Sequence, residues 1–448
     1  MSDTILKILE TISSYVWGLP MIILLIGTGI FLTVRLGMIQ VFSLPKALKM
    51  VFSRSQAKGE GDISPFKALM TALSATIGTG NIAGVATAIA AGGPGALFWM
   101  WITAIFGMAT KYSEALLAVK YRVKDANGEM IGGPMYALER GLGMKWLGVL
   151  FAIFGSIAAF GLGNMVQSNA VSEALKETFN VTPWITGFIL AILVAAVILG
   201  GIKRIGEVAG FLVPIMASIY MLCALMILIM NIKAIPGALS QVFLHAFSPT
   251  AATGGFLGAM IKETIQSGVS RGLFSNESGL GSAPIAAAAA KTPSPKYQAL
   301  ISMTGTFIDT LVVCTMTGLV IIITGSWFQE LSPDVDKAAQ ITIAAFDKGF
   351  FGNYGGYVVS IGLIFFAYST ILGWSYYGEK CFEYLFGVKA VLPYRLVWVG
   401  FVFLGSVTQL AIVWTFADIM NALMAAPNLI ALLFLSSVIV KETKETDV

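Results

Sequence analysis

Long apolar segments follow one another along almost the whole chain, and they limit its fold more than any other feature. A helix needs about 20 mostly apolar residues to cross a bilayer, and eleven such segments can be read from the sequence. Only 12% of the residues are charged, against about 25% in soluble proteins. The sequence therefore predicts an all-α polytopic membrane protein. The expected spans cover 12–34, 65–92, 95–119, 147–176, 183–201, 206–231, 253–289, 297–325, 353–377, 393–412 and 414–440.

The same composition argues against several other classes of protein. The net charge of +4 forms no continuous basic stripe, so no nucleic-acid partner is expected. Cys223, Cys314 and Cys381 are odd in number and show no CxxC spacing, which favours buried thiols over a disulfide or metal framework. The single His245 lies between two expected spans, and we interpret it as an interfacial or core side chain. No His-Asp or Ser-Lys pair is evident at membrane depth, so no enzyme is expected.

Lys and Arg alternate between rich and poor connections along the chain. The rich connections hold 21 of these residues and the others hold five. Because cytoplasmic loops carry the excess of Lys and Arg, we expect the N-terminus outside and the C-terminus in the cytoplasm of a cell bearing this protein in its plasma membrane. Segments 37–52 and 236–247 are predicted to be short interfacial helices, and 326–350 is predicted to be an outer loop.

Two spans contain clusters of glycine and small polar residues near mid-membrane depth. They read Ser74–Gly84 in the second span and Gly268–Gly281 in the seventh. Such clusters weaken a helix, and unwound backbone in a membrane is tolerated only where it is buried or lines a cavity. Helix packing through small residues is the alternative for each cluster taken alone. Without the first span, the two interrupted spans open two sets of five, the signature of an inverted repeat with its site between the repeats.

This pattern divides the chain into four parts. We expect a peripheral N-terminal helix with a cytoplasmic amphipathic connection over 1–64, and a first five-helix repeat over 65–231. The second, inverted five-helix repeat covers 232–440, and 441–448 form a cytoplasmic tail. With the first span, the two repeats account for the eleven predicted helices.

Ionisable residues inside spans are candidates for function. Arg271 is predicted to pair with Glu277 or Asp309, either as part of the transport path or as a structural ion pair. A local pair of Lys262 and Glu263 is expected near the outer mouth, and Asp418 is the remaining ionisable residue within a span.

Uncharged polar side chains also lie in the spans. Gln167 is predicted either to contact the substrate or to join two helices by a hydrogen bond. Ser369 and Thr370 can bond to their own backbone, but their position opposite a broken helix favours binding of an ion.

Three motifs resemble those of the alanine or glycine:cation symporter family. Gly92–Gly107 is similar to the sixteen-residue signature of that family, and 75–84 and 275–284 are also typical of it. The resemblance covers essentially the whole chain. It implies sodium-coupled uptake of alanine or glycine and the five-plus-five inverted fold of leucine-transporter-like proteins. Sodium is then a co-transported ion and not a prosthetic group. The expected partners are small neutral amino acids, sodium and the bilayer, with no obligate protein partner.

The resemblance also implies a set of site residues. The run 78–81 is similar to the Gly-x-Gly-Asn run of leucine-transporter-like proteins, which implies a substrate carboxylate near the backbone of Gly78 to Gly80. The implied sodium ligands are the carbonyls of Ser74 and Ile77 with the hydroxyls of Ser369 and Thr370, and Asn81 and Asp309 are candidates for a second cation site. The full set expected to bind substrate is Thr76, Gly78, Thr79, Gly80, Gln167, Gly272, Phe274, Asn276 and Trp374.

The expected function is therefore a symporter that works by alternating access. Gly78 and Gly80 let the backbone approach a ligand closely, while Phe274 and Trp374 can close the side-chain end of the pocket, which favours alanine and glycine over larger amino acids. Proton coupling in the same fold is the nearest alternative. A channel is a weaker one, because these spans carry too few polar residues to line a continuous pore.

Overall fold

The computed structural model describes residues 2–53, 59–247, 257–328, 335–350, 354–408 and 411–445. Within these ranges, seven helices are long and apolar enough to cross a membrane, and one bent pair of helices adds an eighth. Two further expected spans are helical but carry ionisable side chains: α7 (Gly95–Lys120) and α14 (Leu257–Asn276). A third, α11 (Pro183–Ile198), is apolar but short. Helices thus occupy every predicted span, while the count of eleven crossings stays a prediction.

The first broken helix has the interruption that its sequence predicts. Helix α5 (Pro65–Thr76) begins at Ser64, whose hydroxyl accepts a hydrogen bond from the backbone N–H of Lys67 at 3.2 Å. The backbone then becomes extended at Ile77. The chain continues as a wide π-helical turn, η1 (Gly80–Gly84), and as α6 (Val85–Gly92), at 54° to α5.

The second broken helix breaks later than expected. Helix α14 stays helical through Asn276, so Gly268 and Gly272 lie inside it and the interruption covers only 277–283, before α15 (Pro284–Ala288). The reason is packing: a Cβ on Gly268 would meet the Ala96 carbonyl oxygen at 2.4 Å, and one on Gly272 would meet the Thr103 hydroxyl at the same distance. These two glycines let α14 lie close against α7, which is the packing role that small residues have between membrane helices.

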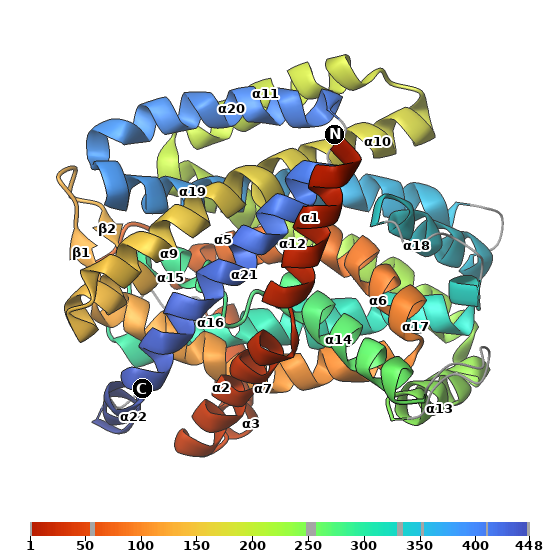
Figure 1. Cartoon of the computed structure of the whole chain (residues 1–448), viewed down its shortest axis with the longest axis horizontal. Coiled ribbons are helices and arrows are strands. Elements are labelled where there is room, and N and C mark those ends of the chain that lie inside the picture. The colour runs from red at the N-terminus through yellow and green to blue at the C-terminus, as the bar shows by residue number, and fades with distance from the viewer. Residues whose placement is uncertain are drawn as a thin grey trace.

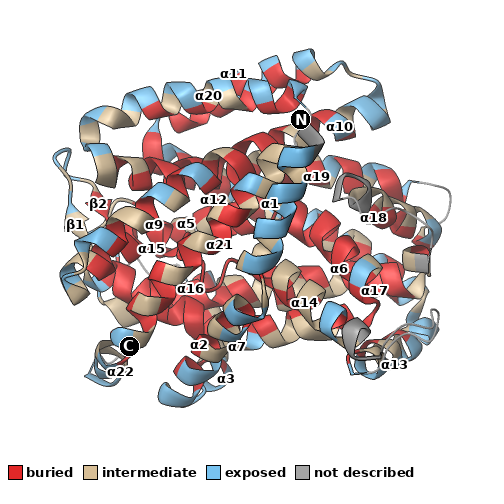
Figure 2. Cartoon of the chain, in the orientation of Figure 1, coloured by how far each residue is buried: buried red, intermediate tan, exposed pale blue. Residues whose placement is uncertain are grey.

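The remaining long helices surround the two broken ones. Two of them contain π-helical turns, so that one runs through α9, η3 and α10 and another through α16, η5 and α17. In Figure 1 helices α11 and α20 lie side by side along the upper edge, and buried residues concentrate in the middle of the bundle (Figure 2). The bounds are α9 (Lys145–Ala158), η3 (Ala159–Met165), α10 (Val166–Phe179), α12 (Gly201–Met230), α16 (Pro295–Thr306), η5 (Phe307–Cys314), α17 (Thr315–Ile323), α19 (Gly355–Phe386), α20 (Val391–Val407) and α21 (Ala411–Phe434).

Shorter elements cover the ends of the bundle. The two segments predicted to be interfacial, 37–52 and 236–247, are largely helical, whereas α18 lies where only a loop was expected. The first expected span is interrupted at Trp17–Gly18. The bounds are α1 (Ser2–Val16), α2 (Leu19–Arg35), α3 (Ile39–Phe42), α4 (Leu44–Phe52), β1 (Val123–Lys124), β2 (Met130–Ile131), α8 (Pro134–Tyr136), η2 (Ala137–Gly141), η4 (Ile232–Ala234), α13 (Ile235–His245), η6 (Ser326–Phe328), α18 (Val335–Gly349), η7 (Val388–Ala390) and α22 (Ser436–Glu445).

One end of the bundle carries the β1–β2 hairpin, and we call it the hairpin end. It lies at the left of Figure 1, with α13 and α18 at the opposite end. There a parallel backbone bridge, here called the 63–290 bridge, joins the start of the first broken helix to the end of the second. Ile63 donates to the Ala289 carbonyl at 3.2 Å, and Lys291 donates to the Ile63 carbonyl at 2.7 Å. Arg122 holds the same strand, donating to the carbonyls of Ala288 and Ala290 at 2.9 and 2.8 Å.

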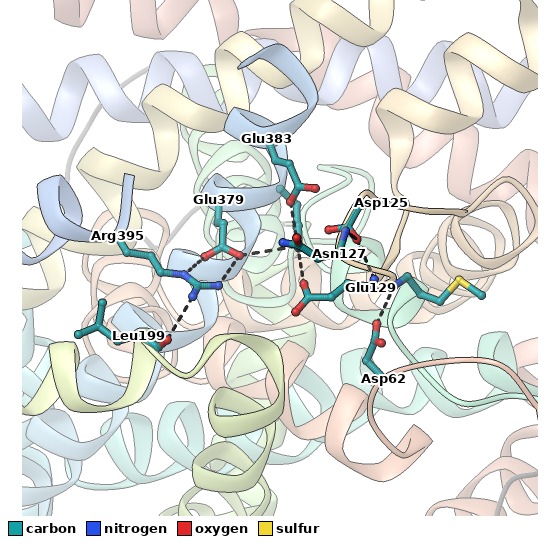
Figure 3. Close-up of polar contacts among 10 residues, drawn as sticks. Asp62, Asp125, Asn127, Glu129, Leu199, Glu379, Glu383 and Arg395 are labelled. Atoms are coloured by element: carbon teal, nitrogen blue, oxygen red, sulfur yellow. Dashed lines mark hydrogen bonds and ion pairs between the residues drawn. The ribbon is translucent and has the colours of Figure 1, made fainter. Parts of the chain in front are cut away.

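An ionic network connects the hairpin to α19 at this end (Figure 3). Lys380 is only 2% exposed, and its Nζ lies 3.0 Å from Glu129 Oε2 and 2.8 Å from Glu383 Oε2. Arg395 binds Glu379 through two N–H groups, at 2.6 and 2.9 Å. A bidentate pair of this kind fixes orientation as well as charge.

The hairpin is tied in turn to the chain before α5. Asp62 Oδ2 accepts a hydrogen bond from the backbone N–H of Met130 at 2.7 Å. Burial raises the pKa of the Asp62 carboxyl, and this hydrogen bond opposes the shift. Hydrogen bonds and ion pairs therefore connect α19, α20 and both broken helices to one another at the hairpin end.

Candidate functional site

A small cavity lies where the two interruptions meet, and residues from both broken helices line it. Its volume is about 20 Å³. Seven of the nine residues expected to bind substrate line it, whereas Gly272 and Asn276 do not. The complete lining is Ala75, Thr76, Gly78, Thr79, Gly80, Leu162, Gln167, Phe274, Glu277, Thr370, Trp374 and Asn421.

Glycines set the shape of this cavity by allowing close contacts. A Cβ on Gly78 would lie 2.5 Å from Thr370 Oγ1, and one on Gly80 would lie 3.2 Å from the Cα of Ser275. The N–H of Gly78 donates to Asn81 Oδ1 at 3.0 Å, so it is already used within the protein. Thr79 and Gly80 open the second half of the broken helix, where the first N–H groups have no partner in the helix. Such a helix start attracts an anion.

Gln167 presents an unpaired oxygen to the cavity. Its Nε2 donates to Thr79 Oγ1 at 3.2 Å and to the Leu162 carbonyl at 3.0 Å. These bonds fix the amide, and its Oε1 is buried without any hydrogen-bond partner in the part of the chain that the structure describes. A buried acceptor without a partner is costly, so this oxygen is suited to a donor on a ligand.

Two hydroxyls from α19 face the first interruption, as the sequence predicts. Ser369 Oγ lies 3.3 Å and Thr370 Oγ1 lies 3.1 Å from the carbonyl oxygen of Ser74. Both hydroxyls also donate to the Phe366 carbonyl, and both side chains are buried. Ile77 lies three residues further along, in the extended stretch. Carbonyl and hydroxyl oxygens are ligands that suit a hard cation such as sodium.

Asn81 and Asp309 meet in a second buried polar cluster, behind the first interruption. Asn81 Nδ2 donates to Asp309 Oδ1 at 2.7 Å. The other carboxylate oxygen, Oδ2, accepts from Ser275 at 2.8 Å and from Thr310 at 2.7 Å. Both broken helices and η5 thus contribute to one cluster, which holds a carboxylate and several neutral oxygens.

Asn276 lies beside this cluster and outside the substrate cavity. Its Nδ2 donates to Thr310 Oγ1 at 3.2 Å, and its Oδ1 accepts from the backbone N–H of Ser278. Asn276 therefore joins α14 to η5 and shapes the turn that follows α14.

The second interruption is held by a buried carboxylate on α7. Glu114 Oε1 accepts from the backbone N–H groups of Gly279 and Gly281, at 3.0 and 3.1 Å, and from Asn428 at 2.7 Å. Both glycines have left-handed backbone, with φ of +91° and +84°, which only glycine adopts freely. Sequence reasoning missed Glu114 and the buried Lys111 because it placed both near the end of a span or in a connection.

The expected pairing of Arg271 was wrong. No ion pair joins it to Glu277 or Asp309 within the described ranges. Its guanidinium instead lies 5.9 Å from the centre of the Phe274 ring and lines a separate cavity of about 580 Å³. That cavity is also lined by Lys262 and Glu263, which form no ion pair with one another in the described structure.

A further cavity of about 60 Å³ extends from the substrate cavity toward α18. Thr79 lines both cavities, and Glu177, Gln340 and Trp414 are among the residues that line the outer one. The rings of Phe274 and Trp414 are stacked between them, with centres 6.4 Å apart. One ring of this pair lines each cavity, since Phe274 lines the substrate cavity and Trp414 lines the outer one.

This bundle of apolar helices, with a small cavity between two interrupted helices, defines a multi-pass membrane transporter. A comparison with protein families agrees with this class. The sequence model of the sodium:alanine symporter family matches residues 2–447. The chain belongs to the sodium:alanine symporter family. The resemblance seen in the sequence is thereby confirmed, as is the expectation of a transporter and not an enzyme.

Two relatives and one solved structure illustrate the similarity. The chain is 59% identical to the sodium/alanine symporter AgcS of Methanococcus maripaludis, over 98% of this chain and 96% of that protein. It is 37% identical to the probable sodium/glutamine symporter GlnT of Bacillus subtilis, over 99% and 91%. The crystal structure of MhsT in complex with L-phenylalanine has a TM-score of 0.59 and 16% identity, covering 87% of this chain and 94% of that one. This last likeness shows the fold alone.

Proposed function

We propose that this protein takes up small neutral amino acids, alanine and glycine, together with sodium by alternating access. The observation that carries the proposal is the small cavity between the interruptions, where Gln167 Oε1 has no partner and a helix start faces the same space. A zwitterion supplies the groups that such a cavity lacks. Its carboxylate suits the N–H groups of the helix start, and its ammonium suits the amide oxygen.

Sodium coupling is supported by the position of the hydroxyl pair. Thr370 lines the substrate cavity and also lies 3.1 Å from the Ser74 carbonyl. An ion held by Ser74, Ile77, Ser369 and Thr370 would therefore fix α5 against α19 next to the substrate. We propose the cluster of Asn81 and Asp309 as a second cation site, because it contains a carboxylate that no Lys or Arg neutralises at ion-pair distance in the described structure.

Alternating access is supported by the two ends of the site. The 63–290 bridge and Arg122 join the broken helices at the hairpin end, whereas toward the other end Thr79 lines both cavities and the Phe274–Trp414 stack contributes one ring to each. We place the hairpin end in the cytoplasm, since it lies among the connections rich in Lys and Arg, with the N-terminus outside. The repeats would then be 65–231 and 232–440, between the segments 1–64 and 441–448, with eleven crossings in all.

Uptake of labelled alanine by proteoliposomes tests this function. We expect uptake only with an inward sodium gradient, and competition by glycine but not by leucine, because Phe274 and Trp374 close the cavity and a clash excludes more sharply than a lost contact. Glutamine belongs in the same panel, since a relative carries that substrate in its name. Uptake driven equally well by a pH gradient without sodium would favour proton coupling instead.

A further inference from the structure

Glu277 is the one ionisable residue among those that line the substrate cavity. It is 3% exposed and is the first residue of the second interruption. The sequence made it one of two alternative partners of Arg271, so its relation to the cavity emerges only from the structure.

The backbone at Glu277 is strained in a way that points to a role for its side chain. Its φ is +55°, and its N–H continues the helix by donating to the Leu273 carbonyl at 2.9 Å. A residue other than glycine in the left-handed region costs on the order of 1–3 kcal/mol. Glycine would end the helix here without that cost, and glycines follow at 279 and 281. The left-handed backbone thus makes the Glu277 side chain a candidate for a role in the adjoining cavity.

The charge of Glu277 has no close cationic partner in the part of the chain that the structure describes. Ser282 Oγ donates to Oε2 at 2.5 Å, and Trp374 is a second neutral hydrogen-bonding neighbour. No nitrogen of Lys, Arg or His lies within 4 Å of the carboxylate in the described ranges. Lys111 attracts it from further away, and the Nζ of that lysine has no hydrogen-bond partner of its own in the described structure.

The other two buried carboxylates near this interruption already have several hydrogen-bond donors within the protein. Glu114 accepts two backbone N–H groups and an amide, and Asp309 accepts an amide and two hydroxyls. Neither lines the cavity. A buried carboxylate that faces a cavity without a cation is costly unless a cation arrives.

The ends of two helices also place opposite partial charges on two sides of the cavity. Glu277 follows the C-terminus of α14, where the helix dipole is negative and favours a cation. Thr79 and Gly80 lie at the start of the second half of the first broken helix, where the dipole is positive. The cavity thus has a negative wall and a positive wall, which matches the two charges of an α-amino acid.

We propose that Glu277 is the counter-ion of the substrate's α-ammonium group and shares it with Gln167 Oε1. The inference rests on the proposed function and deepens it, because it makes a charged amine obligatory. Propionate has the methyl group and the carboxylate of alanine but no ammonium, and it should not compete.

The test uses the purified full chain and the substitution Glu277→Gln, which keeps the shape and removes the charge. We expect alanine affinity at saturating sodium to fall about tenfold or more. Sodium affinity without alanine, measured from sodium-dependent thermal stabilisation, should not change. Glu277→Asp should recover part of the alanine affinity. Glu114→Gln is the comparison for stability: it alters a buried carboxylate that holds the same interruption but does not line the cavity, so it should lower Tm and reduce alanine affinity less than Glu277→Gln does.

Three results would overturn the inference. The first is a Glu277→Gln protein with the alanine affinity of the wild type. The second is an equal loss of sodium affinity without alanine, because the carboxylate would then bind the ion. The third is competition by propionate against labelled alanine in the wild type, which decides the matter even if the Glu277 variants do not fold. A wild-type chain that binds no alanine with sodium present would defeat the proposed function itself, and this inference with it.

Discussion

The substitution Gln167→Leu distinguishes two possible roles of this amide, which are to bind the substrate or only to join helices. The substitution keeps the volume of the side chain and removes its oxygen and nitrogen. In the structure it breaks two hydrogen bonds, those to Thr79 Oγ1 and to the Leu162 carbonyl. It also removes Oε1, which has no partner inside the described protein.

The two effects have separate magnitudes. A hydrogen bond contributes about 0.5–1.5 kcal/mol net, so the loss of two costs roughly 1–3 kcal/mol of folding free energy. The loss of Oε1 removes a buried acceptor that has no partner in the described structure, and this offsets part of that cost in the free protein. It leaves the bound ammonium short of one acceptor, which costs roughly 1–3 kcal/mol of binding, about five- to 150-fold in alanine affinity.

Melting temperature and alanine affinity are measured on the same purified variant. Gln298→Leu is a matched control, because Gln298 is also buried with an unpaired Oε1 and donates to Ser302 at 3.2 Å, but does not line the substrate cavity. We expect both variants to melt at lower temperature and only Gln167→Leu to lose alanine affinity. A Gln167→Leu protein that is less stable but binds alanine normally would refute the reasoning and make the amide a packing group.

Three further substitutions test other parts of the site. Thr370→Val removes a hydroxyl 3.1 Å from the Ser74 carbonyl and should raise the half-saturating sodium concentration about tenfold. The control Ser375→Ala removes a hydroxyl that donates to the Leu372 carbonyl in its own helix, and it should leave that concentration unchanged. Gly78→Ala puts a Cβ 2.5 Å from Thr370 Oγ1 and should abolish sodium-dependent alanine binding; uptake at the wild-type rate would show that the helices there can move apart. Arg122→Gln removes the side chain that holds the 63–290 bridge and should speed amide hydrogen exchange in the bridge, measured by mass spectrometry. Unchanged exchange would mean that the backbone bonds suffice.

Much of the site could be predicted from the sequence because its chemistry is local. The run around Gly78 weakens a helix by composition alone, and the hydroxyls of Ser369 and Thr370 are adjacent, so the structure places both near the Ser74 carbonyl. Gln167 is an amide in an apolar span and has few possible functions. In each case the residue type and its depth in the membrane carry the information.

The remaining features depend on contacts between distant segments. Gly272 and Gly78 look alike in sequence, but the first packs against α7 and the second lies beside α19. Spacing could not show that Arg271 lies against the Phe274 ring and not beside Glu277 or Asp309, because three-dimensional position decides it. Glu277 was recognised as ionisable within a span, yet its place in the cavity wall depends on one left-handed residue, whose backbone conformation the residue type does not indicate.

The strength of the 63–290 bridge bears on how often the empty protein would open at the hairpin end. The bridge has three backbone hydrogen bonds, from Asp62, Ile63 and Lys291, which together contribute about 2–4 kcal/mol. Since each 1.4 kcal/mol is a tenfold change in population, the bridge taken alone would be broken in on the order of one molecule in a hundred at any moment. In the proposed transport cycle, that rarity would limit leakage of sodium through an unloaded carrier. A few kcal/mol of differential ligand affinity would be enough to reverse this population, so the proposed cycle would need no energy source beyond the ion gradient.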